Sequence, residues 1–129
     1  MAEMIEMRFP AKREYIKAIR LAVSGIACNI EYTVDEIEDL KTCVAEACIL
    51  LLCGQTCEAI GLDIECSDNI NFRIHGLAID PVCEECDDCT GFNEEISRLM
   101  IQSLSEDVQF VEKDGVLNEI LFKKSPTAQ

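Results

Sequence analysis

Three cysteines follow one another at a spacing of three residues, Cys83, Cys86 and Cys89, and form two overlapping CxxC motifs. Thiolates at this spacing can hold a Zn²⁺ ion or an iron–sulfur cluster, but both prefer four ligands and the motif supplies three. Cys57 and Cys66 are candidates for the fourth ligand. The four carboxylates between the thiols would attract a cation but disfavour the thiolate form. Metal binding and free reduced thiols are therefore both open interpretations.

Glu46 and His75 are the other two side chains whose types could support catalysis. Glu46 stands in a helical pattern, where a lone glutamate more often provides a surface charge than a general base. His75 is the only histidine of the chain and precedes Gly76 on the polar side of an alternating segment. No cysteine or serine nucleophile is evident beside it, so we assign His75 no catalytic role.

Arg13, Lys17 and Arg20 recur at three- and four-residue spacing and would share one face of a helix. Such a stripe is usually a solvated surface, but this chain is otherwise acidic, with 11 basic and 25 acidic side chains and a net charge of −14. The stripe is therefore a candidate partner-binding face. The acidic remainder of the chain disfavours nucleic acid as a partner and suits a basic protein.

Length and cysteine usage limit the class of protein further. Nine cysteines without a secretion signal are typical of a cytoplasmic protein with reduced thiols. The longest apolar run has seven residues, 47–53, whereas a transmembrane helix needs about 20, so no membrane span is predicted. A chain of 129 residues predicts one domain, 1–129, with a frayed tail at residues 125–129. The helical cysteines are expected to be small core residues, namely Cys28, Cys43, Cys48 and Cys53.

Hydrophobic periodicity predicts the elements that must position these side chains. Alternation predicts strands at 3–9, 60–66, 69–75, 108–112 and 116–122, and three- and four-residue spacing predicts helices at 11–30, 33–53 and 96–104. Thr33 and Glu36 form a capping-box signature at the start of the second helix. Locally paired strands with helices on one face predict an α+β fold, a two-layer sandwich whose mixed sheet is mostly antiparallel.

Three segments resemble the anti-sigma factor serine kinases of the GHKL superfamily, which share the Bergerat ATPase fold. They are FPAKREY at 9–15, IRLAVSG at 19–25 and YTVDEIEDLKTCVAEAC at 32–48. The resemblance is dense over residues 5–48 and thinner, though in register, over 70–122. It implies a homodimeric kinase that uses ATP and Mg²⁺, with a sigma factor or an anti-sigma antagonist as its partner.

The resemblance also places the family's nucleotide-binding motifs on residues that have changed type. The base of the Glu-Ala-x-x-Asn motif is kept as Glu46, but the Mg²⁺-binding Asn position is Leu50, which has no lone pair for a hard cation. The Asp-x-Gly motif that reads adenine falls on Ile74 and Gly76. An isoleucine cannot accept the hydrogen bond of the adenine amino group.

The third motif of the family is a glycine-rich phosphate cradle before the last helix. Its glycines fall on Glu94, Glu95 and Ser97, so two carboxylates stand where a polyanion would bind. The sequence therefore predicts a degenerate member that binds a protein partner without nucleotide. One alternative is an active ATP-dependent serine kinase with a remodelled site, and another is a metal or redox sensor at the cysteine motif.

Overall fold

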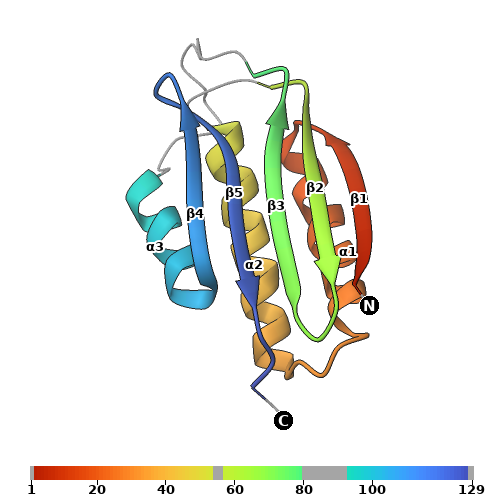
Figure 1. The fold of residues 1–129 in the computed structure, drawn as a ribbon. Helices are drawn as coiled ribbons and strands as arrows, with labels where there is room; N and C mark the ends of the chain where they lie inside the picture. The colour runs from red at the N-terminus through yellow and green to blue at the C-terminus, as the bar shows by residue number, and fades with distance from the viewer. Residues whose placement is uncertain (1, 54–56, 80–92, 128–129) are drawn as a thin grey trace.

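Within the part of the chain that the structure describes, a five-stranded sheet forms one layer and three α-helices form the other (Figure 1). The computed structural model describes residues 2–53, 57–79 and 93–127. The sheet order is β1-β2-β3-β5-β4, with strands at Glu3–Pro10, Ala59–Cys66, Ile70–Leu77, Glu106–Lys113 and Val116–Lys124 for β1 to β5. The helices are α1, Ile16–Ala27, α2, Val34–Leu52, and α3, Glu94–Leu104.

The two-layer α+β sandwich expected from the sequence is confirmed, and each of the four strand pairings is antiparallel. In the β4–β5 hairpin Lys113 pairs with Val116, which leaves Asp114 and Gly115 as the turn. Both turn residues have positive φ, +52° and +78°. This conformation suits a two-residue hairpin and explains why Asp-Gly is found at this point.

The first two helices differ in how closely the sequence predicts their bounds. The capping box sets the start of α2: the Glu36 amide donates to Thr33 Oγ1 and the Thr33 amide donates to Glu36 Oε1. By contrast, α1 is shorter than the predicted 11–30. A single 3-10 turn, Arg13–Tyr15, precedes it, and the amides of Asn29 and Ile30 bond back three residues rather than four.

The core lies between the helices and one face of the sheet. Its fully buried large side chains come from all three helices and from the three central strands, and include Ile19, Leu40, Leu51, Leu62, Ile74, Ile101 and Ile120. Tyr32 secures the α1–α2 connection to this layer, because its hydroxyl accepts from the Ile70 amide at 3.0 Å and donates to the Lys124 carbonyl. Burial raises the pKa of Tyr32 to about 12.

The helical cysteines were expected to lie in the core. Cys43, Cys48 and Cys53 are buried as expected, but Cys53 is disulfide-bonded rather than a reduced thiol, and Cys28 is exposed because it follows the last residue of α1. Near the C-terminus, the Ser125 amide donates to Glu106 and the Thr127 amide donates to Glu36. Residues 128 and 129 of the predicted tail lie outside the described residues.

None of the described helices combines the length and apolar character needed to cross a membrane.

Candidate functional site

Glu46 of α2 and Ser97 of α3 are in direct contact. The Ser97 hydroxyl donates a hydrogen bond of 2.7 Å to Glu46 Oε2, and Ser97 is only 4% exposed. The two residues are 51 positions apart and meet because α2 and α3 pack side by side. Glu46, which the resemblance predicts to be a base, is therefore hydrogen-bonded to Ser97, which stands where the resemblance predicts a phosphate-binding glycine.

Leu50 and Ile74 are part of the hydrophobic core. Leu50 lies one turn beyond Glu46 on α2 and is 3% exposed. Ile74 is fully buried in β3, where it pairs with Leu62 of β2 and Ile120 of β5. Neither side chain has an atom that can coordinate a cation or accept a hydrogen bond, and both contribute to the packing of the core.

Gly76 is covered by another part of the chain. A Cβ atom at this position would lie 2.9 Å from Cδ1 and Cγ1 of Ile79 and 3.6 Å from Cβ of Cys57. A distance below 3 Å is closer than carbon atoms pack, so Ile79 fills the space directly above the glycine. In the family this glycine belongs to the adenine-reading motif, and here an apolar side chain occupies the approach to it.

The start of α3 carries two carboxylates. Glu94 Oε1 accepts from Arg98 Nη2 at 2.8 Å, and Arg98 also donates to Glu112 at 2.9 Å. Burial alone would lower the pKa of Arg98, but the hydrogen bonds to these two glutamates raise it overall. Glu95 is exposed and its side chain has no hydrogen bond or ion pair within residues 2–53, 57–79 and 93–127. Both carboxylates interact favourably with the helix dipole and occupy the end that would attract an anion.

The predicted basic stripe borders a hollow of about 540 Å³ between α1 and α2. Arg13, Lys17 and Arg20 line it together with Lys41, and Ile16 and Leu21 supply its apolar surface. Leu21 is 62% exposed. We call this feature the basic hollow.

Lys17 and Arg20 form no ion pair with any residue that the structure describes, whereas Lys41 pairs with Glu38 at 3.0 Å. The sequence missed Lys41, because its position beside the stripe depends on how the two helices pack. The stripe is thus one side of a hollow with four cations rather than a flat solvated face. Such a surface suits an acidic partner that carries an apolar side chain.

Comparison with known proteins supports the resemblance over part of the chain. A segment of 47 residues is 57% identical to the serine-protein kinase RsbW of Bacillus subtilis, and 46 residues are 59% identical to that of Halalkalibacterium halodurans. This segment resembles an anti-sigma factor kinase. It covers 36% of this chain and 28–29% of those relatives, so the chain spans less than a third of their length. No model of a protein family matches the chain.

The structure places the residues that the resemblance assigns to a nucleotide site, and their roles stay predictions. Glu46 remains, while the positions expected to bind Mg²⁺, adenine and phosphate are filled by Leu50, Ile74 and Ser97. Ile79 was not singled out from the sequence, because residues 76–93 show no periodicity that would place a side chain over Gly76. The contact between Glu46 and Ser97 also has no sequence signal, since it depends on the packing of two distant helices.

The proposed metal ligands Cys83, Cys86 and Cys89 lie outside the described residues. The candidates for a fourth ligand lie at opposite ends of β2. Cys57 precedes this strand and Cys66 is its last residue, and the strand is roughly 23 Å long. One metal ion could therefore use only one of them. Among the described residues, no group of three or more histidine, cysteine, aspartate or glutamate side chains is arranged to hold a metal ion.

His75 belongs to a polar cluster on the face of the sheet opposite the helices. Its Nε2 lies 3.4 Å from Oδ2 of Asp63, and Arg73 bridges Asp63 and Glu119 with two bonds of 2.6 Å. The imidazole lies directly over Gly61, where a Cβ atom would be 2.5 Å from its Cε1. These contacts give His75 a structural environment on this face of the sheet.

Proposed function

We propose that the chain is an anti-sigma-factor-like regulatory protein that binds a sigma factor or an anti-sigma antagonist and has lost ATP binding and kinase activity. The hydrogen bond between Ser97 and Glu46 carries the proposal. It engages one oxygen of the carboxylate that would accept the proton of a substrate serine, and Ser97 stands, buried, where the resemblance predicts a glycine of the phosphate cradle. The RsbW-like segment supports the class of protein.

Electrostatics at the start of α3 supports the loss of nucleotide. A phosphate oxygen about 4 Å from a carboxylate, at an effective dielectric constant of about 20, is destabilised by about 4 kcal/mol. Arg98 offsets the charge of Glu94, but Glu95 has no cationic partner in the part of the chain that the structure describes. Mg²⁺ would reduce the repulsion, but its asparagine ligand is replaced by the buried Leu50.

The basic hollow is the surface through which we propose that the partner binds. It carries Arg13, Lys17, Arg20 and Lys41 around an exposed leucine, whereas the chain as a whole has a net charge of −14. An acidic segment with an apolar side chain would neutralise these cations and cover Leu21. A homodimer in the cytoplasm is the assembly and location that the family resemblance favours for this function.

A nucleotide thermal-shift measurement tests the proposal. The full chain is melted with and without Mg-ATP, and RsbW of Bacillus subtilis serves as the positive control under the same conditions. A ligand that binds only the folded state raises the melting temperature by mass action. We expect a shift for the control and none for this chain at millimolar Mg-ATP. A shift of several degrees for this chain would overturn the loss of ATP binding.

An active serine kinase with a remodelled site is the second candidate. It is favoured by the retention of Glu46 and by the similarity to serine-protein kinases. In that case the Ser97 hydroxyl would have to move from Glu46, which would then accept the proton of the substrate serine as that oxygen takes the γ-phosphoryl group of ATP. Transfer of labelled phosphate from ATP to a protein serine would support this candidate.

A metal or redox sensor at the cysteine motif is a third candidate, carried by the CxxCxxC spacing alone. Metal analysis of protein purified without a histidine tag separates it from the other two. A content below about 0.1 metal ion per chain would exclude a constitutive metal site.

A further inference from the structure

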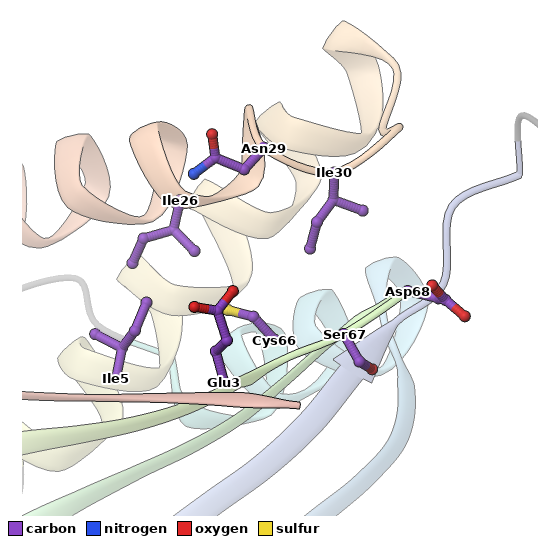
Figure 2. A pocket seen from close by; sticks show the side chains of 8 residues that line it. All are labelled: Glu3, Ile5, Ile26, Asn29, Ile30, Cys66, Ser67 and Asp68. Atoms are coloured by element: carbon purple, nitrogen blue, oxygen red, sulfur yellow. The ribbon is translucent and has the colours of Figure 1, made fainter. Parts of the chain in front are cut away.

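A second surface of opposite charge lies at the other end of α1. A hollow of about 420 Å³ lies between the end of α1, the start of β1 and the β2–β3 loop (Figure 2). A neighbouring hollow of about 440 Å³ shares four of its lining residues. We call the two together the acidic trough. Its carboxylates are Glu3, Glu31 and Asp68, and its apolar surface is formed by Ile5, Ile26 and Ile30.

The charges of the acidic trough are not neutralised locally. Glu3, Glu31 and Asp68 are exposed, and none of them forms an ion pair with another described residue. The last turn of α1 contains no basic side chain that would offset the negative end of the helix dipole. Burial, followed by the nearby carboxylate of Glu3, raises the pKa of the Cys66 thiol in the same hollow. The electrostatic potential in the trough is therefore strongly negative.

The acidic trough also has an apolar floor. In Figure 2 the side chains of Ile5, Ile26 and Ile30 point toward the same space from β1 and from the end of α1. All three are partly buried and pack against the core. A small inorganic cation would leave this surface uncovered, whereas a peptide segment with both cationic and apolar side chains would cover it.

We propose that the acidic trough binds a cationic amphipathic segment of a partner protein. Charge complementarity selects the cationic side chains and the three isoleucines select the apolar ones. This binding site is additional to the one in the proposed function. The trough lies at the C-terminal end of α1, whereas the basic hollow lies along the first turns of that helix. A helix of 12 residues is about 18 Å long, so one partner could contact both surfaces in a fixed orientation.

A titration of the full chain with a synthetic peptide tests the proposal. The probe is a 14-residue peptide of leucine and lysine with leucines at helical spacing, and the measurement is its dissociation constant at 150 mM NaCl. The triple variant Glu3→Gln, Glu31→Gln, Asp68→Asn should bind about tenfold more weakly. The control Glu6→Gln, Glu58→Gln, Glu65→Gln changes the net charge equally at exposed sites outside the trough and should weaken binding less than threefold.

Three further results determine whether the trough itself is the site. The Cδ1 methyl signals of Ile5, Ile26 and Ile30 should shift on titration while that of Ile16, in the basic hollow, should not. Equal weakening in the two triple variants, or no methyl shifts, would overturn the proposal. It would also be overturned if replacing the peptide's leucines with serines left the affinity unchanged, which would indicate a bare cation site. Altered self-association of the trough variant would show instead that a second copy is the occupant.

Discussion

The Ser97 hydroxyl donates to Glu46 Oε2 across the interface between α3 and α2. The family resemblance predicts that the position of Ser97 would contact a phosphate and that Glu46 would activate a substrate hydroxyl. Here they satisfy one another, in a place where Ser97 is almost completely buried. This hydrogen bond joins the two helices.

Ser97→Ala should destabilise the fold by about 1–2 kcal/mol, because it leaves a partly buried carboxylate without its hydrogen-bond donor. Urea denaturation measures the free energy of unfolding. Ser103→Ala is the matched control, since its hydroxyl donates only to the Leu99 carbonyl on the exposed side of the same helix. The double variant Ser97→Ala, Glu46→Gln should recover part of the loss, because a neutral amide is less costly to leave without a donor. Equal stability of the two serine variants would contradict this view of the contact.

Gly76→Ala should destabilise the fold by about 1–3 kcal/mol, because the new methyl group would meet the Ile79 side chain at 2.9 Å. The double variant Gly76→Ala, Ile79→Ala should cost less than the two single changes added together, since it removes the atoms that clash. Gly25→Ala is the control. Nothing lies within 4 Å of a Cβ atom at this α1 position, and alanine should stabilise the helix by about 0.5–1 kcal/mol. Additive single effects at residues 76 and 79 would show that Ile79 does not cover the glycine.

The elements were predictable where the signal is local. The capping box of Thr33 and Glu36 fixed the start of α2, and Asp114-Gly115 fixed the last hairpin, because each motif satisfies its own backbone groups. The end of α1 was placed three residues too late. Asn29 and Ile30 continue the hydrophobic spacing but bond three residues back, which no periodicity in the sequence reports.

For the candidate site, the sequence indicates the types of the residues but not the contacts between them. The resemblance predicts that Leu50 and Ile74 stand where polar residues of a nucleotide site would be; both are in the core, and their assignment to the site stays a prediction. It could not show that Ser97 reaches Glu46, that Lys41 completes the basic hollow, or that Ile79 covers Gly76. Each of these contacts depends on the relative placement of elements, which hydrophobic periodicity does not encode.

Glu36 should make the stability of the fold depend on pH in the acid range. The hydrogen bond from the Thr33 amide lowers the pKa of this carboxyl, and a further bond from the Thr127 amide acts in the same direction. A carboxyl with a depressed pKa stabilises the folded state above its unfolded pKa of about 4.5, and this contribution is lost as the pH falls through the folded value.

Glu36→Gln should therefore cost about 1 kcal/mol at pH 7 and flatten the loss of stability between pH 5 and pH 3. Urea denaturation at a series of pH values measures both effects. Asp35→Asn is the neighbouring control, because its side chain is exposed and no hydrogen bond from it to another described residue is seen. Parallel pH profiles for Glu36→Gln and the unaltered chain would contradict the assignment.

Charge reversal at the basic hollow should weaken binding of the partner without unfolding the chain. Arg20→Glu is expected to reduce the affinity by about 1–3 kcal/mol if the guanidinium forms a desolvated ion pair, and adding Lys41→Glu on the facing helix should reduce it further. The partner is a protein captured from the native cell lysate by the full chain, and its affinity is measured by calorimetry.

Arg8→Glu is the control, because Arg8 is exposed on β1 and does not line the hollow. Arg8 is exposed, while Arg20 and Lys41 are partly buried; because surface ion pairs contribute little to folding, the melting temperatures of all three variants should stay within a few degrees of the unaltered chain. An affinity that is unchanged in Arg20→Glu, or equally reduced in Arg8→Glu, would remove the basic hollow from the interface.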